Sequence, residues 1–229
     1  DSIYLANKNE ATGRAVLIVP GGAYRFVAIE HEGFDWASFF IPKGISCFVL
    51  KYRMPKGNRL VPIGDAEEAM KLIRRNAAKW NIDPNQVGIM GFSAGGHLSS
   101  TIATHSKLDA KPNFHILFYP VITMDPSYTH LDSMKNFLGS DNPTKQLIEE
   151  FSNEKQITKE TSPVFIVLSN DDASVPPLNG VNYYLDCNKQ GVSASLHIYP
   201  TGGHGWGYRD SFAYHTVMVK ELEDWLKSF

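Results

Sequence analysis

The sequence is poor in cysteine, carries no strong excess of either charge and contains no long apolar run. Its two cysteines, Cys47 and Cys187, form no C-x-x-C pair, so neither a disulfide framework nor a zinc or redox motif is indicated. No apolar stretch approaches the roughly 20 residues that a membrane-spanning helix needs. The formal net charge of −2 at pH 7 gives no electrostatic reason to expect nucleic acid or an anionic membrane as a partner.

The sequence does contain an alternation of short apolar runs and longer amphipathic stretches. Six runs are typical of strands: residues 15–19, 45–50, 87–90, 114–119, 164–168 and 196–199. Most of them are continuously apolar, as buried parallel strands are. Apolar residues recur at steps of three and four between Ala66 and Trp80 and between Tyr214 and Trp225, which predicts two helices. The alternation predicts an α/β fold with a mostly parallel sheet of about six strands and helices on both faces.

A chain of 229 residues is expected to form a single domain, residues 1–229. Residues 121–142 fit neither the strand nor the helix pattern and are long for a plain connection. We expect this segment to be a small cap or substrate-shaping loop, with an inert surface excursion as the alternative. Because the chain begins at Asp1 and not at methionine, we expect that an upstream segment was removed.

Residues 91–95 read Gly-Phe-Ser-Ala-Gly, the G-x-S-x-G pattern of a nucleophile elbow. In such an elbow a strand leads into a sharp turn that exposes the serine, and a helix follows whose N-terminus faces the developing negative charge. Residues 86–90 suit the strand, and residues 95–104 suit the helix. The pattern predicts that Ser93 is a nucleophile, and the alternative is a glycine-rich turn with a surface serine.

A serine hydroxyl is a weak nucleophile near neutral pH and needs a base beside it and an acid that orients the base. His204 is the best candidate base, because its glycine-rich loop follows the last predicted strand, whereas His97, His197 and His215 suit structural positions. The acid is expected after the preceding strand, where Asp171 and Asp172 are adjacent. We favour Asp172, since it lies just before the chain turns into the next helix, with Asp171 as the alternative.

Acyl transfer also requires backbone N–H groups that stabilise an oxyanion. One is expected from Ala94, at the start of the helix that follows Ser93. The other is expected from the turn that follows the first strong strand, where Gly22 is preferred and Gly21 and Ala23 are near alternatives. Glycine at these positions allows the backbone to approach a ligand closely.

Six ordered segments between residues 20 and 206 form a larger pattern. They are Pro20-Gly21-Gly22-Ala23-Tyr24, His31-Glu32-Gly33, Lys51-Tyr52-Arg53-Met54-Pro55, Gly91-Phe92-Ser93-Ala94-Gly95-Gly96-His97-Leu98, Tyr119-Pro120-Val121-Ile122 and Gly203-His204-Gly205-Trp206. Together they resemble the bacterial acetyl xylan esterase-like branch of the α/β-hydrolases. Ala23 stands where many relatives have a third glycine. The first antiparallel strands of a full α/β-hydrolase sheet are expected to be missing or reduced to residues 3–5.

The resemblance implies hydrolysis of carboxylic esters, with small acyl groups such as acetate removed from xylan or xylo-oligosaccharides. It implies neither a metal nor an organic cofactor. Carried over by motif, Ser93 is the nucleophile, Asp172 the acid, His204 the base, and Ala94 with the loop of Gly21 and Gly22 forms the oxyanion hole. The partner is then a small-molecule or oligosaccharide ester, and a secreted or periplasmic location is favoured over a cytoplasmic one.

Four residues beside these loops are candidates for lining the sugar or acyl pocket: Tyr24, Arg25, Glu32 and Trp206. The two aromatic rings could stack on pyranose rings or could simply close the core. A general small-ester hydrolase or an arylformamidase would use the same catalytic residues. A peptidase of the prolyl-oligopeptidase type shares the order of the three catalytic residues but usually carries a large additional domain, and a non-catalytic binding module typically lacks the nucleophile or the base. The sequence does not determine the oligomeric state.

Overall fold

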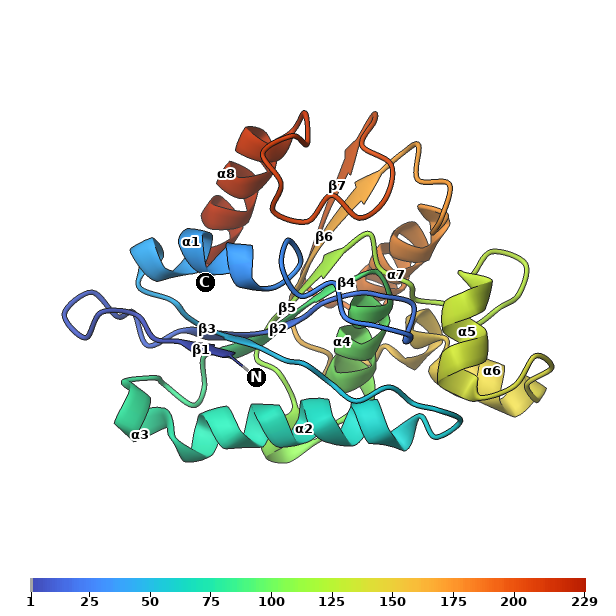
Figure 1. Cartoon of the computed structure of the whole chain (residues 1–229), viewed down its shortest axis with the longest axis horizontal. Coiled ribbons are helices and arrows are strands. Elements are labelled where there is room, and N and C mark those ends of the chain that lie inside the picture. Colours follow the sequence, from blue (N-terminus) through green and yellow to red (C-terminus); the bar gives the residue numbers. More distant parts are fainter. Residues whose placement is uncertain (1) are drawn as a thin grey trace.

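The computed structural model describes residues 2–229 and consists of a twisted sheet with helices on both faces (Figure 1). The strands are β1 (Ser2–Tyr4), β2 (Ala15–Val19), β3 (Ser46–Val49), β4 (Val87–Phe92), β5 (His115–Phe118), β6 (Val164–Ser169) and β7 (Ala194–Tyr199). Their order in the sheet is β1-β3-β2-β4-β5-β6-β7. β1 pairs antiparallel with β3, and the other five pairings are parallel. Asp1 lies outside the described residues.

The predicted mostly parallel sheet is confirmed. All residues of β2 to β6 are buried, which is why these strands are mostly apolar in sequence; Ser46, His115 and Ser169 are the polar exceptions. β7 is partly exposed because it forms an edge of the sheet. β1 is the short remnant expected near residues 3–5, and it protects the opposite edge.

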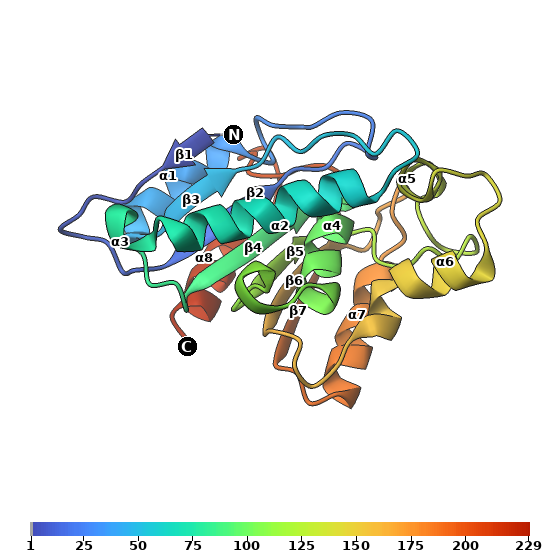
Figure 2. The same cartoon turned by 90° about the horizontal axis from the view of Figure 1, so that it is seen from below.

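The helices are α1 (Ala37–Phe40), α2 (Leu60–Arg75), α3 (Ala77–Trp80), α4 (Ser93–His105), α5 (Leu131–Leu138), α6 (Lys145–Phe151), α7 (Leu178–Lys189) and α8 (His215–Leu226). Short 3₁₀ turns occupy Phe34–Trp36, Ile41–Lys43, Leu108–Ala110 and Asn153–Gln156. α2, α4 and α7 cover the face seen in Figure 2, and α1 and α8 cover the other face. Side chains of alternate residues in β2 point to opposite faces of the sheet: Leu17 packs on the side of α2 and α4, and Val16 packs on the side of α1 and α8. The helix expected from Ala66 to Trp80 is interrupted at Asn76, which separates α2 from α3.

The segment predicted as a cap or loop, residues 121–142, begins with buried chain and contains α5. Met134 and Phe137 of α5 pack into the same apolar cluster as Tyr24. The Asn136 side-chain amide donates a hydrogen bond of 2.8 Å to the carbonyl oxygen of Ala23. α5 is therefore tied to the turn after β2, and whether the segment acts as a cap remains a prediction. Within residues 2–229, no helix has both the length and the apolar character needed to cross a bilayer.

Candidate active site

Ser93 occupies the sharp turn between β4 and α4, as the elbow pattern predicts. Its φ of 52° is unusual for a residue other than glycine and costs about 1 kcal/mol or more. The flanking glycines are required by close packing. A Cβ at Gly91 would lie 2.2 Å from the Gly95 carbonyl oxygen, and a Cβ at Gly95 would lie 2.1 Å from the Val19 carbonyl oxygen. The turn therefore holds the Ser93 hydroxyl at the carboxyl end of β4, where ligands of open α/β sheets bind.

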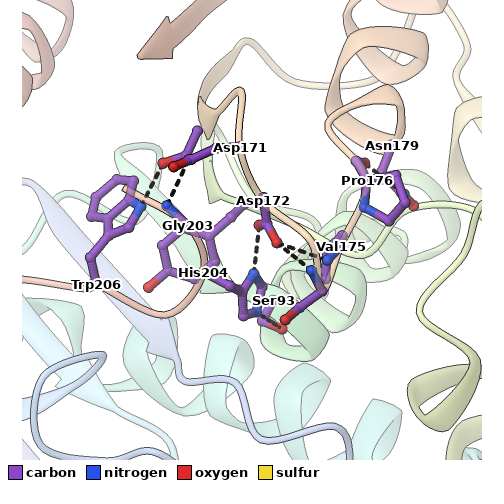
Figure 3. A network of polar contacts seen from close by, with 12 residues as sticks. Ser93, Asp171, Asp172, Val175, Pro176, Asn179, Gly203, His204 and Trp206 are labelled. Atoms are coloured by element: carbon purple, nitrogen blue, oxygen red, sulfur yellow. Dashed lines mark hydrogen bonds and ion pairs between the residues drawn. The ribbon is translucent and has the colours of Figure 1, made fainter. Parts of the chain in front are cut away.

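The imidazole of His204 lies between Ser93 and Asp172 (Figure 3). Its Nε2 is 2.8 Å from the Ser93 hydroxyl oxygen, and its Nδ1 is 2.7 Å from Oδ2 of Asp172. A carboxylate can only accept, so Nδ1–H donates to Asp172 and Nε2 is left to accept from the serine hydroxyl. This is the tautomer in which an imidazole can take a proton from serine.

The two adjacent aspartates have different partners. Oδ1 of Asp172 accepts hydrogen bonds of 2.9 Å from the backbone N–H groups of both Ser174 and Val175, so the carboxylate is locked with Oδ2 toward His204. Asp171 is exposed and accepts from the Gly203 N–H at 2.8 Å. The structure thus brings Asp172 to the imidazole and leaves Asp171 to hold the backbone beside His204.

Two of the other histidines considered as bases, His97 and His197, have structural partners. His97 is fully buried, with Nε2 donating to the Phe151 carbonyl at 2.9 Å and Nδ1 accepting from the Tyr24 hydroxyl at 2.9 Å. Burial lowers the pKa of His97 to about 4, so this ring stays neutral. His197 lies in β7 and pairs with Glu221 at 3.1 Å.

The two glycines of the turn after β2, Gly21 and Gly22, differ in the hydrogen bonds of their backbone N–H groups. We call residues 20–28 the glycine loop. The Gly21 N–H donates to Oε2 of Glu32 at 2.7 Å and is therefore not free to bind an oxyanion in this structure, which favours Gly22 over Gly21 as the candidate donor. The Ala28 N–H donates to the Gly21 carbonyl at 2.9 Å, and because the peptide is trans the Gly22 N–H points the opposite way. The Gly22 N–H donates to no protein acceptor in residues 2–229.

Ala94 is the second residue of α4, where backbone N–H groups have no partner within the helix. Gly22 and Ala94 therefore remain the candidate oxyanion donors. Ala23 adopts a left-handed conformation with a φ of 54°, which is more usual for glycine. The loop tolerates alanine there while keeping a glycine-like backbone.

Two candidates for substrate binding are instead part of the protein's internal packing. Trp206 is buried, donates from Nε1 to the Ser169 hydroxyl at 3.0 Å and stacks on Phe212 with ring centroids 3.9 Å apart. Glu32 is 3 % exposed and is held by protein donors. Neither side chain is presented to a sugar, because a ring or carboxylate engaged in this way has no free face.

Arg25 and Tyr24 lie on an open cavity of about 500 Å³. It is lined by Tyr24, Arg25, Met54, Lys56, Gly57, Lys135, Asn136, Gly139, Ser140 and Asp141. The Arg25 side chain is 61 % exposed and lies 3.6 Å from Asp132 of α5. Tyr24 contributes only an edge, since its ring is buried and its hydroxyl bonds to His97. A substrate-binding role for these two residues remains a prediction.

Sequence reasoning missed two side chains beside the imidazole of His204. The ring of Tyr119 packs edge-on to that of His204, with centroids 4.8 Å apart. His130 caps α5 with its Nδ1, and burial and the charge of His204 lower the pKa of His130. Tyr119 directly follows β5, so its position at the carboxyl edge of the sheet could have indicated that it lies near the site. The sequence around His130 contains no comparable signal. Residues 2–229 contain no group of three or more His, Cys, Asp or Glu side chains placed to hold a metal ion.

Comparison with known proteins connects this geometry to a family. The family model described as BD-FAE matches residues 2–184. The chain is 45 % identical over 220 residues to "Acetylxylan esterase" of Xylanibacter ruminicola, covering 95 % of this chain and 46 % of that protein. It is 35 % identical over 217 residues to "Endo-1,4-beta-xylanase B" of Butyrivibrio fibrisolvens, covering 88 % of this chain and 34 % of that protein. The chain thus spans less than half the length of these curated relatives.

A solved structure, that of the acetyl ester-xyloside bifunctional hydrolase from Caldicellulosiruptor lactoaceticus, superposes with a TM-score of 0.92 and 34 % identity. The match covers 99 % of this chain and 86 % of that one. MGS-M1, an alpha/beta hydrolase from a deep-sea metagenome library, superposes with a TM-score of 0.74 over 98 % of this chain and 87 % of that one, at 24 % identity, which shows the shared fold. The resemblance to acetyl xylan esterase-like α/β-hydrolases that the motifs indicated is confirmed. The chain belongs to the BD-FAE family and has the α/β-hydrolase fold.

Proposed function

We propose that this protein is a serine carboxylesterase that removes acetyl groups from carbohydrate esters such as acetylated xylan or xylo-oligosaccharides. The observation that carries the proposal is the continuous hydrogen-bonded chain from the Ser93 hydroxyl through His204 to Asp172. The carbohydrate part rests on the xylan- and xyloside-related names of the relatives, together with their sequence identity to this chain.

In the first half-reaction, Ser93 attacks the ester carbonyl carbon while its proton passes to Nε2 of His204. The electron pair of the carbonyl bond moves to its oxygen, where the N–H groups of Gly22 and Ala94 stabilise the negative charge. Asp172 stabilises the imidazolium through the Nδ1–H bond. When the tetrahedral intermediate collapses, the bond to the sugar oxygen breaks and that oxygen takes the proton from His204. The acetyl group remains on Ser93.

In the second half-reaction, His204 removes a proton from water, and the water oxygen attacks the acetyl carbon. The new tetrahedral intermediate uses the same two N–H groups. Its collapse breaks the bond to the Ser93 oxygen, which regains the proton from His204, and acetic acid leaves and releases its proton to the solvent as acetate forms. The enzyme returns to its starting protonation state.

The test measures acetate release from acetylated xylo-oligosaccharides, 4-nitrophenyl acetate, a long-chain 4-nitrophenyl ester and an aryl amide. We expect the acetylated saccharide and the acetate ester to be hydrolysed, and we expect Ser93→Ala to abolish both activities. Saccharide deacetylation no faster than that of unrelated acetylated alcohols would favour a general small-ester hydrolase. Faster cleavage of the amide would favour a peptidase or formamidase activity, and no turnover of any ester would favour a binding module.

A further inference from the structure

Glu32 lies at the meeting point of the two loops that carry the proposed oxyanion donor and the proposed base. We call residues 202–209 the histidine loop. Oε2 of Glu32 accepts from the Gly21 N–H at 2.7 Å, and Oε1 accepts from the Tyr119 hydroxyl at 2.8 Å. The same Tyr119 oxygen accepts from the Gly207 N–H of the histidine loop at 2.8 Å. One buried carboxylate therefore connects the glycine loop, the end of β5 and the histidine loop.

We propose that Glu32 is a positioning residue that holds the Gly22 N–H and the imidazole of His204 in their reactive places. The inference rests on the proposed esterase function. It reassigns Glu32 from the substrate pocket to the support of the catalytic groups.

On the side of the glycine loop, Glu32 fixes one end of Gly21 and the Ala28 N–H fixes the other. The direction of the Gly22 N–H follows from these two bonds, because a trans peptide holds its N–H opposite the carbonyl. Gly21 is also tightly confined, since a Cβ there would lie 2.9 Å from Cβ of Ser93. A small rotation of this peptide would change the distance from the Gly22 N–H to the oxyanion, and a misplacement of about 1 Å can cost about 100-fold in rate.

On the side of the histidine loop, the Tyr119 hydroxyl connects Glu32 to the backbone of the loop. Burial, followed by the charge of Glu32, raises the pKa of Tyr119 well above its ordinary value, so the phenol keeps its proton and donates to the carboxylate. Its ring packs against the imidazole of His204 with centroids 4.8 Å apart. The backbone N–H of Tyr208 donates to the His31 carbonyl at 2.8 Å, which holds the same loop to the residue beside Glu32.

The test compares Glu32→Gln with the wild type in the whole chain. An amide keeps the shape but has only one acceptor oxygen, so it cannot accept from both the Gly21 N–H and the Tyr119 hydroxyl. We expect kcat for 4-nitrophenyl acetate to fall about tenfold to 100-fold with KM changed less than about threefold. The inhibition constant of a small alkylboronic acid, which forms a tetrahedral adduct with serine, should rise by a similar factor.

The matched control is Tyr183→Phe, which removes a buried hydroxyl 2.9 Å from Nε2 of His115 in a different part of the fold. It should lower the melting temperature while leaving kcat within about twofold of the wild type. Tyr119→Phe is a second variant that keeps Glu32 and removes its donor, and it should lower kcat at unchanged KM even if Glu32→Gln folds poorly.

The inference would be overturned if Glu32→Gln and Tyr119→Phe kept the wild-type kcat, or if Tyr183→Phe lost as much kcat as they do at the same loss of melting temperature. In both cases the wild type is an active esterase, so the proposed function stands. A wild type that neither hydrolyses any ester nor binds the boronic acid would overturn the proposed function together with the inference.

Discussion

The hydrogen bonds of Asp172 predict the consequence of replacing this residue by asparagine. Both Ser174 and Val175 donate backbone N–H groups to Oδ1, so the asparagine must place its carbonyl oxygen there and turn its NH₂ group toward His204. Nδ1 of the imidazole, which now faces a donor, must become an acceptor, and the proton moves to Nε2. The ring then cannot take a proton from Ser93, although the geometry is intact.

In serine proteases the same change of tautomer lowers kcat by about 10⁴-fold, which corresponds to about 5 kcal/mol in the activation free energy. We expect a loss of this size for Asp172→Asn, measured as kcat for 4-nitrophenyl acetate, with a melting temperature close to that of the wild type. The control is Asp171→Asn, in which the amide oxygen can still accept from the Gly203 N–H, so kcat should change less than about threefold.

The reasoning would be refuted if Asp172→Asn kept more than about a tenth of the wild-type kcat. It would also be refuted if Asp171→Asn lost as much activity as Asp172→Asn, because the two aspartates would then not differ in role. A circular dichroism melt of each variant separates these results from unfolding.

Two further predictions concern packing and pH. Gly21→Ala places a Cβ 2.8 Å from the Phe92 carbonyl oxygen. We expect urea unfolding to show a loss of about 1–3 kcal/mol in the free energy of unfolding, and hydrolysis of 4-nitrophenyl acetate to show the loss of most esterase activity. Gly64→Ala in α2 meets no atom within 4 Å and should stabilise by up to about 1 kcal/mol; equal effects of the two substitutions would contradict the packing argument. Because burial lowers the pKa of His97 to about 4 from its ordinary 6.5, the unfolded chain binds a proton between these pH values that the folded chain does not. Stability is therefore retained above pH 6.5 and falls as the pH drops toward 4, by up to about 1.4 kcal/mol per pH unit from this residue. Urea unfolding from pH 7 to pH 5 should show a shallower fall for His97→Gln, and an identical slope would count against the assignment.

The location of the strands and of the elbow could be predicted from local sequence, because the causes are local. A strand buried on both faces is apolar at most positions, and β2 and β4 show this directly. A turn in which an added Cβ would lie within 2.2 Å of a backbone oxygen can accept only glycine, so Gly91 and Gly95 mark the place of Ser93. The order of the serine, the aspartate and the histidine along the chain then identified the three groups of the site.

The sequence by itself therefore indicated the parallel sheet, the serine in the turn after β4 and the candidate residues that act with it. Only the tertiary structure shows that Asp172 and not Asp171 contacts the imidazole, that the Gly21 N–H donates to Glu32, and that Glu32 and Trp206 are buried among protein partners. Each of these outcomes depends on partners brought from distant parts of the chain, as when Tyr119 meets a carboxylate 87 residues away. Composition and spacing record whether a residue is buried and in which element it lies, but the direction of a hydrogen bond is set by groups that meet only after the chain has folded.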